Sequence, residues 1–318
     1  MEVLVDDTVM DLEVVGLRRE ADGVLSVELR DRADRLLPSW GPGAHVDLVV
    51  GGHVRQYSLC GDPAERRRYR VAVLREPASR GGSTHVHDRL RPGDEVEVGG
   101  PRNHFPLADA SRHLLVAGGI GITPVLTMAA DLAARGADWR LVYLGRARRG
   151  MAFLDELSVL DAGAGRVTLH TDDVDGIPDL DTLLTGLDPS TAVAVCGPAG
   201  LIAAVEAHCA ARGLPVPRAE RFAAVERDAD EVLTPFDVVV ASTGARITVP
   251  AHRSALEVLD EAGVGLPNAC RDGVCGSCLV RVVAGEPWHR DALTAPDRTD
   301  VLAPCVSRAR GAELVLDL

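Results

Sequence analysis

Three cysteines near the carboxyl end of the chain have the spacing of metal ligands. Cys270, Cys275 and Cys278 form a Cys-x4-Cys-x2-Cys run, and Cys305 follows after 26 further residues. Four thiolates in this arrangement are the ligand set of a [2Fe–2S] cluster. Two glycines inside the run permit a tight loop whose backbone amides can approach the cluster sulfurs. The cysteines therefore predict a centre that accepts one electron at a time.

Two other interpretations of the cysteines are weaker. A structural zinc site usually has two Cys-x2-Cys pairs, and this region has one. A disulfide framework is disfavoured because the chain has seven cysteines, an odd number. Cys60 and Cys209 have no ligand-like neighbours and are expected to be small buried hydrophobic residues.

The residues before the cysteine run predict the elements that would hold it. Residues 236–240 and 246–249 are β-rich and flank a Ser-Thr-Gly-Ala turn, which is typical of a hairpin. Ser254 and Glu257 form a capping box that begins a helix over 255–262. Two strands, a helix and then a cysteine loop resemble the plant-type ferredoxin fold over residues 234–318.

The middle of the chain alternates short apolar runs with helical patterns. The runs cover 113–117, 139–144, 166–170 and 191–195, and the helical patterns cover 125–135 and 201–212. Such alternation predicts a doubly wound parallel sheet, which binds ligands at the carboxyl ends of its strands.

Two of these strand ends carry residues suited to a dinucleotide. A glycine-rich turn with a threonine follows the first strand (Gly118, Gly119, Gly121 and Thr123), and Cys196-Gly197 follows the fourth. The glycines let a diphosphate approach the backbone at a helix N-terminus. The turn does not match the Gly-x-Gly-x-x-Gly pattern of dinucleotide-binding folds. A single glycine turn after a strand is more often only a structural turn than a ligand site. Both turns together, ahead of a one-electron carrier, favour a nucleotide site.

The first hundred residues are predicted to form an antiparallel β-barrel. Alternating apolar residues mark strands at 11–15, 24–29, 45–50, 69–74 and 94–98, with Pro-Gly turns among them. Residues 55–59 (Arg-Gln-Tyr-Ser-Leu) combine a cation, a flat aromatic ring and a hydroxyl. Residues 80–84 are predicted to be a glycine turn with two hydroxyls, which suits a phosphate.

Charge and hydropathy exclude several classes of partner. The formal net charge of −13 repels nucleic acid and anionic membranes. No apolar run reaches the roughly 20 residues that cross a bilayer. The amino terminus is acidic where a secretory signal is basic, so a cytoplasmic protein is expected.

The three segments, in this order, resemble the phthalate dioxygenase reductase family, which includes the vanillate demethylase reductase subunits. The resemblance spans essentially the whole chain and implies a multidomain protein. The expected parts are an antiparallel β-barrel FMN domain (1–108), a doubly wound α/β NAD(P)H domain (109–225), a linker (226–233) and an α+β, β-grasp [2Fe–2S] ferredoxin domain (234–318).

The resemblance also implies roles for individual residues. Arg55 would hold the FMN phosphate, Tyr57 would pack on the ring, and Ser58 would lie near the reactive N5 atom. Further flavin contacts would come from Gln56, Gly81, Gly82, Ser83 and Thr84. The nucleotide would contact Gly118, Gly119, Gly121, Thr123, Cys196 and Gly197, with Arg146 near its ribose and Phe222 covering the flavin until nicotinamide displaces it. The cluster ligands would be Cys270, Cys275, Cys278 and Cys305.

The implied activity is electron transfer from NADH, or NADPH, through FMN and a [2Fe–2S] cluster to a partner. The expected partner is a terminal oxygenase acting on an aromatic substrate, either a Rieske non-haem iron enzyme or a haem-thiolate mono-oxygenase. Ser58, Cys196 and Phe222 would line the hydride-transfer site. The chain is expected to act as a monomer. A redox-sensing iron–sulfur flavoprotein and a general NAD(P)H–acceptor reductase are the alternatives.

Overall fold

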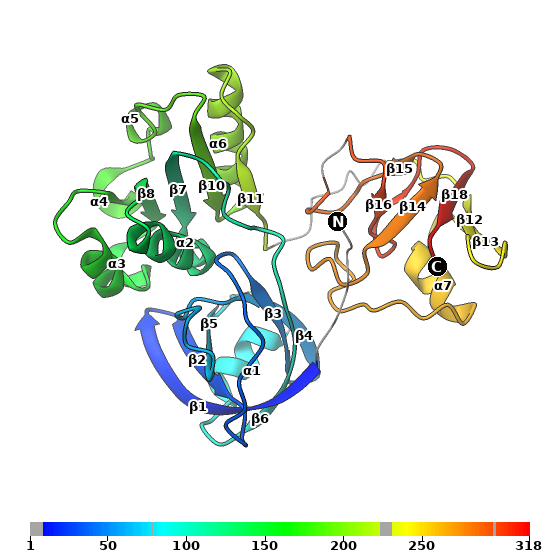
Figure 1. Cartoon of the computed structure of the whole chain (residues 1–318), viewed down its shortest axis with the longest axis horizontal. Coiled ribbons are helices and arrows are strands. Elements are labelled where there is room, and N and C mark those ends of the chain that lie inside the picture. Colours follow the sequence, from blue (N-terminus) through cyan, green and yellow to red (C-terminus); the bar gives the residue numbers. More distant parts are fainter. Residues whose placement is uncertain (1–8, 78, 80, 223–230, 295–296) are drawn as a thin grey trace. The chain divides into compact units, whose positions relative to one another are not determined.

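The computed structural model describes residues 9–77, 79, 81–222, 231–294 and 297–318, and the chain divides into two compact units. The first unit is Met1–Glu220, and the second is Arg221–Leu318. The first unit contains an antiparallel sheet and a parallel sheet, and the second contains a smaller mixed sheet (Figure 1).

The antiparallel sheet of the first unit is a six-stranded barrel with the order β4-β3-β6-β1-β2-β5. Its strands are β1 (Val9–Ala21), β2 (Val24–Arg30), β3 (His45–Val50), β4 (His53–Ser58), β5 (Arg68–Leu74) and β6 (Glu95–Arg102). A bridge between Leu59 and Val71 joins the end of β4 to β5, so the two edges of the sheet meet. Apolar residues that alternate along the strands fill the interior, which is the pattern that predicted the barrel.

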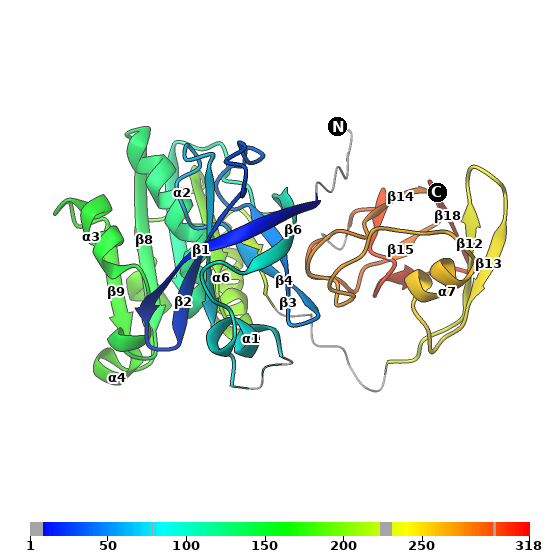
Figure 2. The same cartoon turned by 90° about the horizontal axis from the view of Figure 1, so that it is seen from below.

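Two elements of the barrel differ from the prediction. Residues 80–84 were predicted as a turn, but Gly82–Thr84 begin helix α1 (Gly82–Asp88; Figures 1 and 2). Val86 of this helix belongs to the barrel core. Gly81, at φ 107°, turns the chain into the helix, a conformation that glycine adopts readily. Strand β4 was missed because five of its six residues are half-buried, and so it has little hydrophobic alternation.

The parallel sheet has the order β11-β10-β7-β8-β9. Its strands are β7 (Arg112–Gly118), β8 (Asp138–Gly145), β9 (Val167–Thr171), β10 (Thr191–Cys196) and β11 (Arg218–Glu220). On one face lie α2 (Ile122–Ala134) and α3 (Leu154–Asp161), and on the other lie α5 (Leu180–Leu183) and α6 (Ala199–Ala211) (Figure 1). Successive residues of β7 enter different clusters, Leu115 with α2 and Leu114 with α6, so both faces are buried.

The barrel and the parallel sheet share one hydrophobic core. Val24, Cys60 and Ala72 of the barrel belong to the same buried cluster as Leu115 and Ile122 of the α/β part. The cluster also contains Met151, Ala152 and Phe153 at the start of α3. The segments predicted as flavin and nucleotide domains therefore form a single unit with continuous packing.

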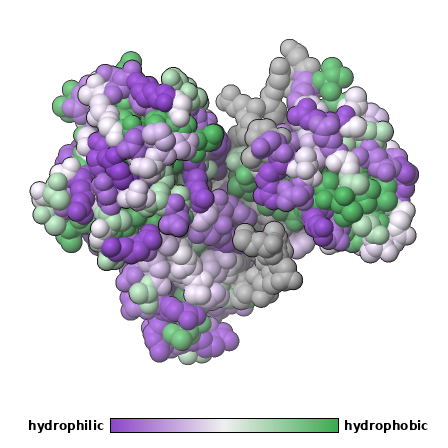
Figure 3. Space-filling model, turned by 45° about the horizontal axis from the view of Figure 1, so that its top comes forward, coloured by the Kyte–Doolittle hydropathy of each residue, from purple (hydrophilic) through white to green (hydrophobic). Residues whose placement is uncertain are grey.

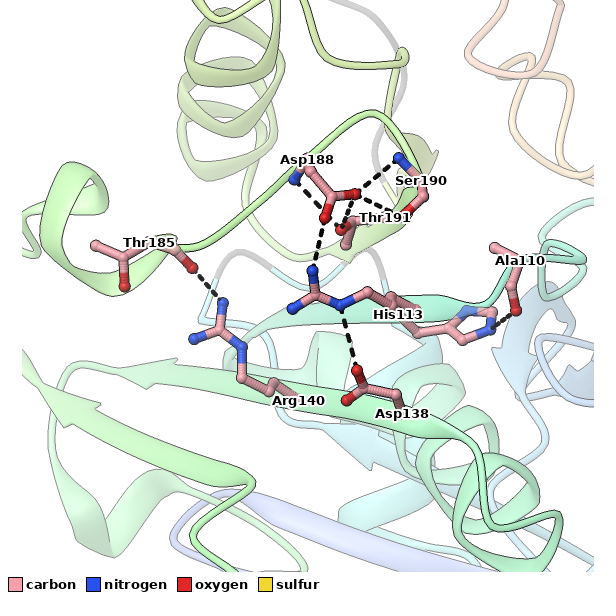
Figure 4. A network of polar contacts seen from close by, with 9 residues as sticks. Ala110, His113, Asp138, Arg140, Thr185, Asp188, Ser190 and Thr191 are labelled. Carbon is pink, nitrogen blue, oxygen red and sulfur yellow. Dashed lines mark hydrogen bonds and ion pairs between the residues drawn. The ribbon is translucent and has the colours of Figure 1, made fainter.

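A polar network ties together the amino ends of the parallel strands. Arg112, which opens β7, donates to Asp138 of β8 at 3.2 Å and to Asp188 at 2.6 Å. Asp188 also accepts hydrogen bonds from Ser190 and Thr191 beside β10 (Figure 4). The residues predicted to bind the nucleotide lie at the opposite, carboxyl edge of the sheet. This network therefore stabilises the sheet and is not part of the predicted site.

The second unit is a five-stranded sheet with the order β13-β12-β18-β14-β16, packed against one helix. The strands are β12 (Phe236–Val240), β13 (Arg246–Val249), β14 (Val280–Ala284), β16 (Val301–Leu302) and β18 (Glu313–Leu316), with a separate pair β15 (Pro287–Trp288) and β17 (Arg308–Ala309). The predicted hairpin is β12–β13, and the predicted helix is α7 (Ala255–Glu261) with the Ser254–Glu257 capping box. Both predictions are confirmed.

No helix among the described residues is long and apolar enough to cross a membrane. On the face shown in Figure 3, hydrophilic and hydrophobic residues are interspersed. The large hydrophobic side chains that are exposed include Val159, Val174 and Ile177, and single residues of this kind are ordinary on protein surfaces.

Candidate functional site

The centre of the candidate site is a buried carboxylate that joins the barrel to the parallel sheet. Parallel pairing of β10 and β11 sets Glu220 opposite Cys196 at the carboxyl edge of the sheet. The Ser58 hydroxyl, at the end of β4, donates to Glu220 Oε2 at 3.2 Å, and the Cys196 thiol lies 3.9 Å from the same oxygen. Ser58 and Cys196, both predicted to line the hydride-transfer site, are thus brought together by Glu220.

Burial controls the charge in this cluster. The Glu220 side chain is 12% exposed, and this burial raises the pKa of its carboxyl to about 8, against the opposing effect of the Ser58 and Cys196 hydrogen bonds. Burial also raises the pKa of the Cys196 thiol, and the neighbouring Glu220 adds to the rise. At neutral pH the site therefore presents a neutral thiol and a largely protonated carboxyl beside a hydroxyl.

The raised pKa of Glu220 makes a prediction about stability. Between about pH 4.5 and 8 the folded chain holds a proton that the unfolded chain releases, so this group lowers the free energy of unfolding as pH rises through that window. We expect Glu220→Gln to have the same Tm as wild type at pH 5. At pH 8.5 its Tm should be at least about 3 °C higher than that of wild type. Thermal unfolding at both pH values measures the difference, with the exposed Glu28→Gln as control. An equal shift at the two pH values would contradict the buried-acid assignment.

The two glycine turns of the nucleotide prediction pack directly on each other. A Cβ atom on Gly121 would lie 2.2 Å from the Cys196 carbonyl oxygen, and one on Gly118 would lie 2.6 Å from Leu201 Cδ2. Only glycine fits at these contacts without displacement of the backbone or of α6. The Thr123 hydroxyl donates to the Ile120 carbonyl at 3.0 Å and is buried, so it stabilises the turn. Gly119, in the 3-10 turn η1 (Gly119–Gly121), and Gly197 remain the backbone positions where a diphosphate could approach.

The predicted flavin residues lie along β4 and against α1. The Arg55 side chain packs on Gly82, since a Cβ there would be 2.8 Å from Arg55 Cγ, and its Nη1 atom donates to the Val54 carbonyl. Tyr57 packs against the barrel core, and burial raises the pKa of its hydroxyl to about 12. The structure thus brings the β4 residues and the Gly81–Thr84 segment together, as a phosphate site requires.

Two of the predicted contacts have partners within the chain. Gln56 Nε2 donates to Asp47 Oδ1 at 2.6 Å, so its side chain is held on the barrel wall. The Ser83 hydroxyl donates to Ser79 and accepts from the Glu76 amide. Their side-chain roles toward FMN remain predictions, although Ser83 and Thr84 place their backbone amides in the first turn of α1.

A cationic loop follows β8 at the same edge of the sheet. Arg146 and Arg148 are exposed, and Arg148 begins the 3-10 turn η2 (Arg148–Gly150). Asp172 and Asp173 of α4 (Asp172–Asp175) follow the adjacent strand β9, and the Asp173 amide donates to the Arg146 carbonyl at 3.1 Å. Two arginines and two aspartates therefore follow the ends of β8 and β9, and a backbone hydrogen bond joins these two segments where a ribose site is expected.

The four predicted cluster ligands form two pairs. Hydrogen bonding from the Cys275 thiol lowers the pKa of the Cys270 thiol, and Cys305 has the same effect on the pKa of Cys278. Among the described residues, no three His, Cys, Asp or Glu side chains surround a single point where one metal ion would sit. Two pairs suit a two-iron cluster, in which each iron takes two thiolates, better than a single zinc ion.

The loop around these cysteines has the shape of a cluster cradle. The Asp272 amide points at Cys270 Sγ from 3.3 Å, and the Ser277 hydroxyl lies 3.1 Å from Cys275 Sγ. Gly273 has φ 75°, and a Cβ there would lie 2.6 Å from Val306 Cγ2. These donors and the close approach at Gly273 fit sulfur atoms held by backbone amides.

A buried polar network supports the cradle from behind, and sequence reasoning missed it. The Asp291 carboxylate accepts from the Ser307 hydroxyl at 2.8 Å and from the Leu293 and Thr294 amides. The Ala292 amide donates to the Gly273 carbonyl at 2.9 Å. The network therefore links the cysteine loop to the segment that carries Cys305.

Other predicted residues are placed less fully. Phe222 is 44% exposed and lies in the second unit, so its position over a flavin remains a prediction. Residues 223–230, which carry most of the predicted linker, lie outside the described residues, as does Arg80. Cys60 and Cys209 are buried, as predicted. The role of Glu220 was missed, although its place at the end of a parallel strand next to Cys196 was a usable signal.

Comparisons with known proteins agree with this arrangement. Residues 238–310 match the family model of the 2Fe-2S iron-sulfur cluster binding domain. The chain is 42% identical to a vanillate O-demethylase oxidoreductase of Pseudomonas sp., over 97% of this chain and 100% of that protein. It is 40% identical to a phthalate dioxygenase reductase of Burkholderia cepacia, over 98% of each chain.

A solved structure extends the similarity to the fold. An intact type IV self-sufficient cytochrome P450 monooxygenase matches 98% of this chain with 41% of its own, at a TM-score of 0.91 and 38% identity. The sequence predictions of a [2Fe–2S] module and a multidomain flavin reductase fold are confirmed. The chain belongs to the phthalate dioxygenase reductase family, the NAD(P)H-dependent reductase components of oxygenase systems.

Proposed function

We propose that this chain takes hydride from NADH and delivers single electrons to a terminal oxygenase that acts on an aromatic substrate. The observation that carries the proposal is the convergence of Ser58, Cys196 and Glu220 in the first unit, in a chain that also carries the paired cluster cysteines. Bound FMN and a [2Fe–2S] cluster would supply the step from a two-electron donor to one-electron deliveries. The partner would be a Rieske or a haem-thiolate oxygenase, and the chain would act as a cytoplasmic monomer.

The residues of the chain would bind and orient these groups. Arg55 and the first turn of α1 would hold the FMN phosphate, and the turns at Gly119 and Gly197 would receive the nucleotide diphosphate. Ser58, Cys196 and Glu220 would keep water and charge from the transfer site, because the first two are buried and the Glu220 side chain is only 12% exposed. In this proposal residues 1–108 serve the flavin, 109–225 the nucleotide, and 234–318 the cluster after the 226–233 linker.

The nucleotide preference follows from the loop after β8. Arg146 and Arg148 could contact a 2′-phosphate, whereas Asp172 and Asp173 beside them favour a ribose diol and repel phosphate. We propose NADH as the preferred donor, with NADPH accepted less well. A higher kcat/KM with NADPH than with NADH would reverse this assignment.

An anaerobic titration tests the function. The purified chain should contain FMN with about two irons and two acid-labile sulfides, and about 1.5 equivalents of NADH should reduce it fully, two electrons going to FMN and one to the cluster. Colourless protein, or zinc without labile sulfide, would overturn the proposal. Full reduction by one equivalent of NADH would mean that the flavin is the only electron acceptor in the chain. The protein would then be a flavin reductase without a working cluster.

A further inference from the structure

Arg70 is a largely enclosed guanidinium at the boundary between the barrel and the α/β part of the first unit. It lies on β5, and its side chain is 21% exposed. Its Nη1 and Nη2 atoms each donate to one oxygen of Glu156, on α3, at 2.8 Å. This two-point geometry is the strongest and most directional form of an arginine–carboxylate pair.

The guanidinium makes further contacts within the first unit. Nη2 and Nε donate to the Cys60 carbonyl at 2.5 and 3.2 Å, and the Cys60 amide donates back to the Arg70 carbonyl at 2.8 Å. The guanidinium carbon lies 5.1 Å from the centre of the Phe153 ring. Arg70 therefore joins its own strand to two other segments of the chain, the residues just after β4 and the start of α3.

Both segments continue directly from the predicted ligand residues. Cys60 follows β4, which ends at Ser58. Phe153 follows the loop that carries Arg146, and that loop is itself fixed, since the Ala152 amide donates to the Tyr143 hydroxyl and Met151 packs on Gly145. The clamp thus connects the end of the flavin strand to the end of the ribose loop.

The barrel also contacts the ribose loop at a second point. The Asp22 amide, in the turn between β1 and β2, donates to the Arg149 carbonyl at 2.8 Å. The Asp22 carboxylate lies 3.7 Å from Arg149 Nε. The barrel therefore contacts this loop at Arg149, through Asp22, and at the start of α3, through Arg70.

We propose that Arg70 is a positioning residue for hydride transfer, acting through Glu156, Phe153 and Cys60 to set the nucleotide loop in register with the flavin strand. The proposal rests on the function proposed above. Hydride transfer needs its reacting atoms about 3–3.5 Å apart, and displacement by about 1 Å can cost a hundredfold in rate. A clamp between the two binding elements therefore acts on the rate without touching either cofactor.

Three variants test this clamp: Arg70→Gln, Glu156→Gln and the double variant. We expect each single change to slow flavin reduction by NADH about tenfold in stopped-flow experiments, and the double change to add little more. The long-wavelength absorbance of the nicotinamide–flavin complex should weaken in parallel. The Kd for FMN and the visible spectrum of the cluster should not change.

Arg68→Gln is the matched control. Arg68 is two residues away on the same strand and pairs with Glu28 at 3.3 Å, with both side chains exposed. The Arg68→Gln variant should reduce its flavin with NADH at the wild-type rate. If Arg70→Gln does not fold, Glu156→Gln still tests the clamp, because it leaves the arginine on Cys60 and Phe153.

Two results would overturn the clamp. Flavin reduction at the wild-type rate in Glu156→Gln, even with a lower Tm, would make the contact purely structural. Losses that multiply in the double variant would show that the two residues act independently. Wild-type protein that NADH does not reduce would instead refute the proposed function, and the clamp with it.

Discussion

Cys275→Ser should abolish electron delivery to cytochrome c while leaving ferricyanide reduction by NADH intact. Cys275 is 1% exposed and paired with Cys270, so its loss removes one of two thiolates expected on one iron. Cytochrome c then loses its one-electron donor, and we expect its turnover to fall at least about a hundredfold. Ferricyanide can accept electrons upstream, from the flavin.

Iron analysis and the two acceptor assays check this result together. Cys209→Ala is the control, because Cys209 is equally buried but lies on α6, in the first unit. It should retain iron and both activities. Cytochrome c turnover that survives Cys275→Ser would mean that electrons reach the acceptor without the cluster, as in a general NAD(P)H–acceptor reductase.

Gly121→Ala should eliminate reduction by NADH without loss of the flavin. The added methyl group would lie 2.2 Å from the Cys196 carbonyl oxygen and 2.5 Å from its carbon, and both are backbone atoms that cannot rotate away. The start of α2 must then separate from the end of β10, where the two nucleotide turns meet. We expect flavin reduction by NADH to slow at least about a hundredfold.

Stopped-flow reduction by NADH, compared with reduction by dithionite, isolates this defect. Dithionite needs no nucleotide site and should bleach the variant normally. Gly200→Ala is the control, since a Cβ there meets no atom within 4 Å and alanine favours the helix. If NADH reduces the flavin of Gly121→Ala at the wild-type rate, the Gly118–Thr123 turn is not part of the nucleotide site.

The local features of this chain were predictable from sequence. Alternation predicted β2 and β3, because one face of each strand fills the barrel core. The Ser254–Glu257 capping box predicted the start of α7 because both hydrogen bonds form within four residues. The cysteine spacing identified a cluster loop for the same reason, since three of its four ligands lie within nine residues.

The features that sequence reasoning missed depend on distant partners. Ser58 and Glu220 are 162 residues apart, and only the register of β10 with β11 makes the carboxylate meet the hydroxyl. Arg70 and Glu156 look like ordinary surface charges until the barrel packs against α3. Strand β4 has half-buried residues on both faces and so lacked a periodic signal.

The shared core of the first unit has a consequence for how such reductases can be recombined. A gene cut near residue 108 would leave Val24, Cys60 and Ala72 without the apolar residues that cover them, and both fragments would be prone to aggregate. The boundary between the two compact units lies after Glu220, so a cut there keeps this shared core whole. Exchange of modules between relatives should therefore succeed when the first 220 residues travel as one block.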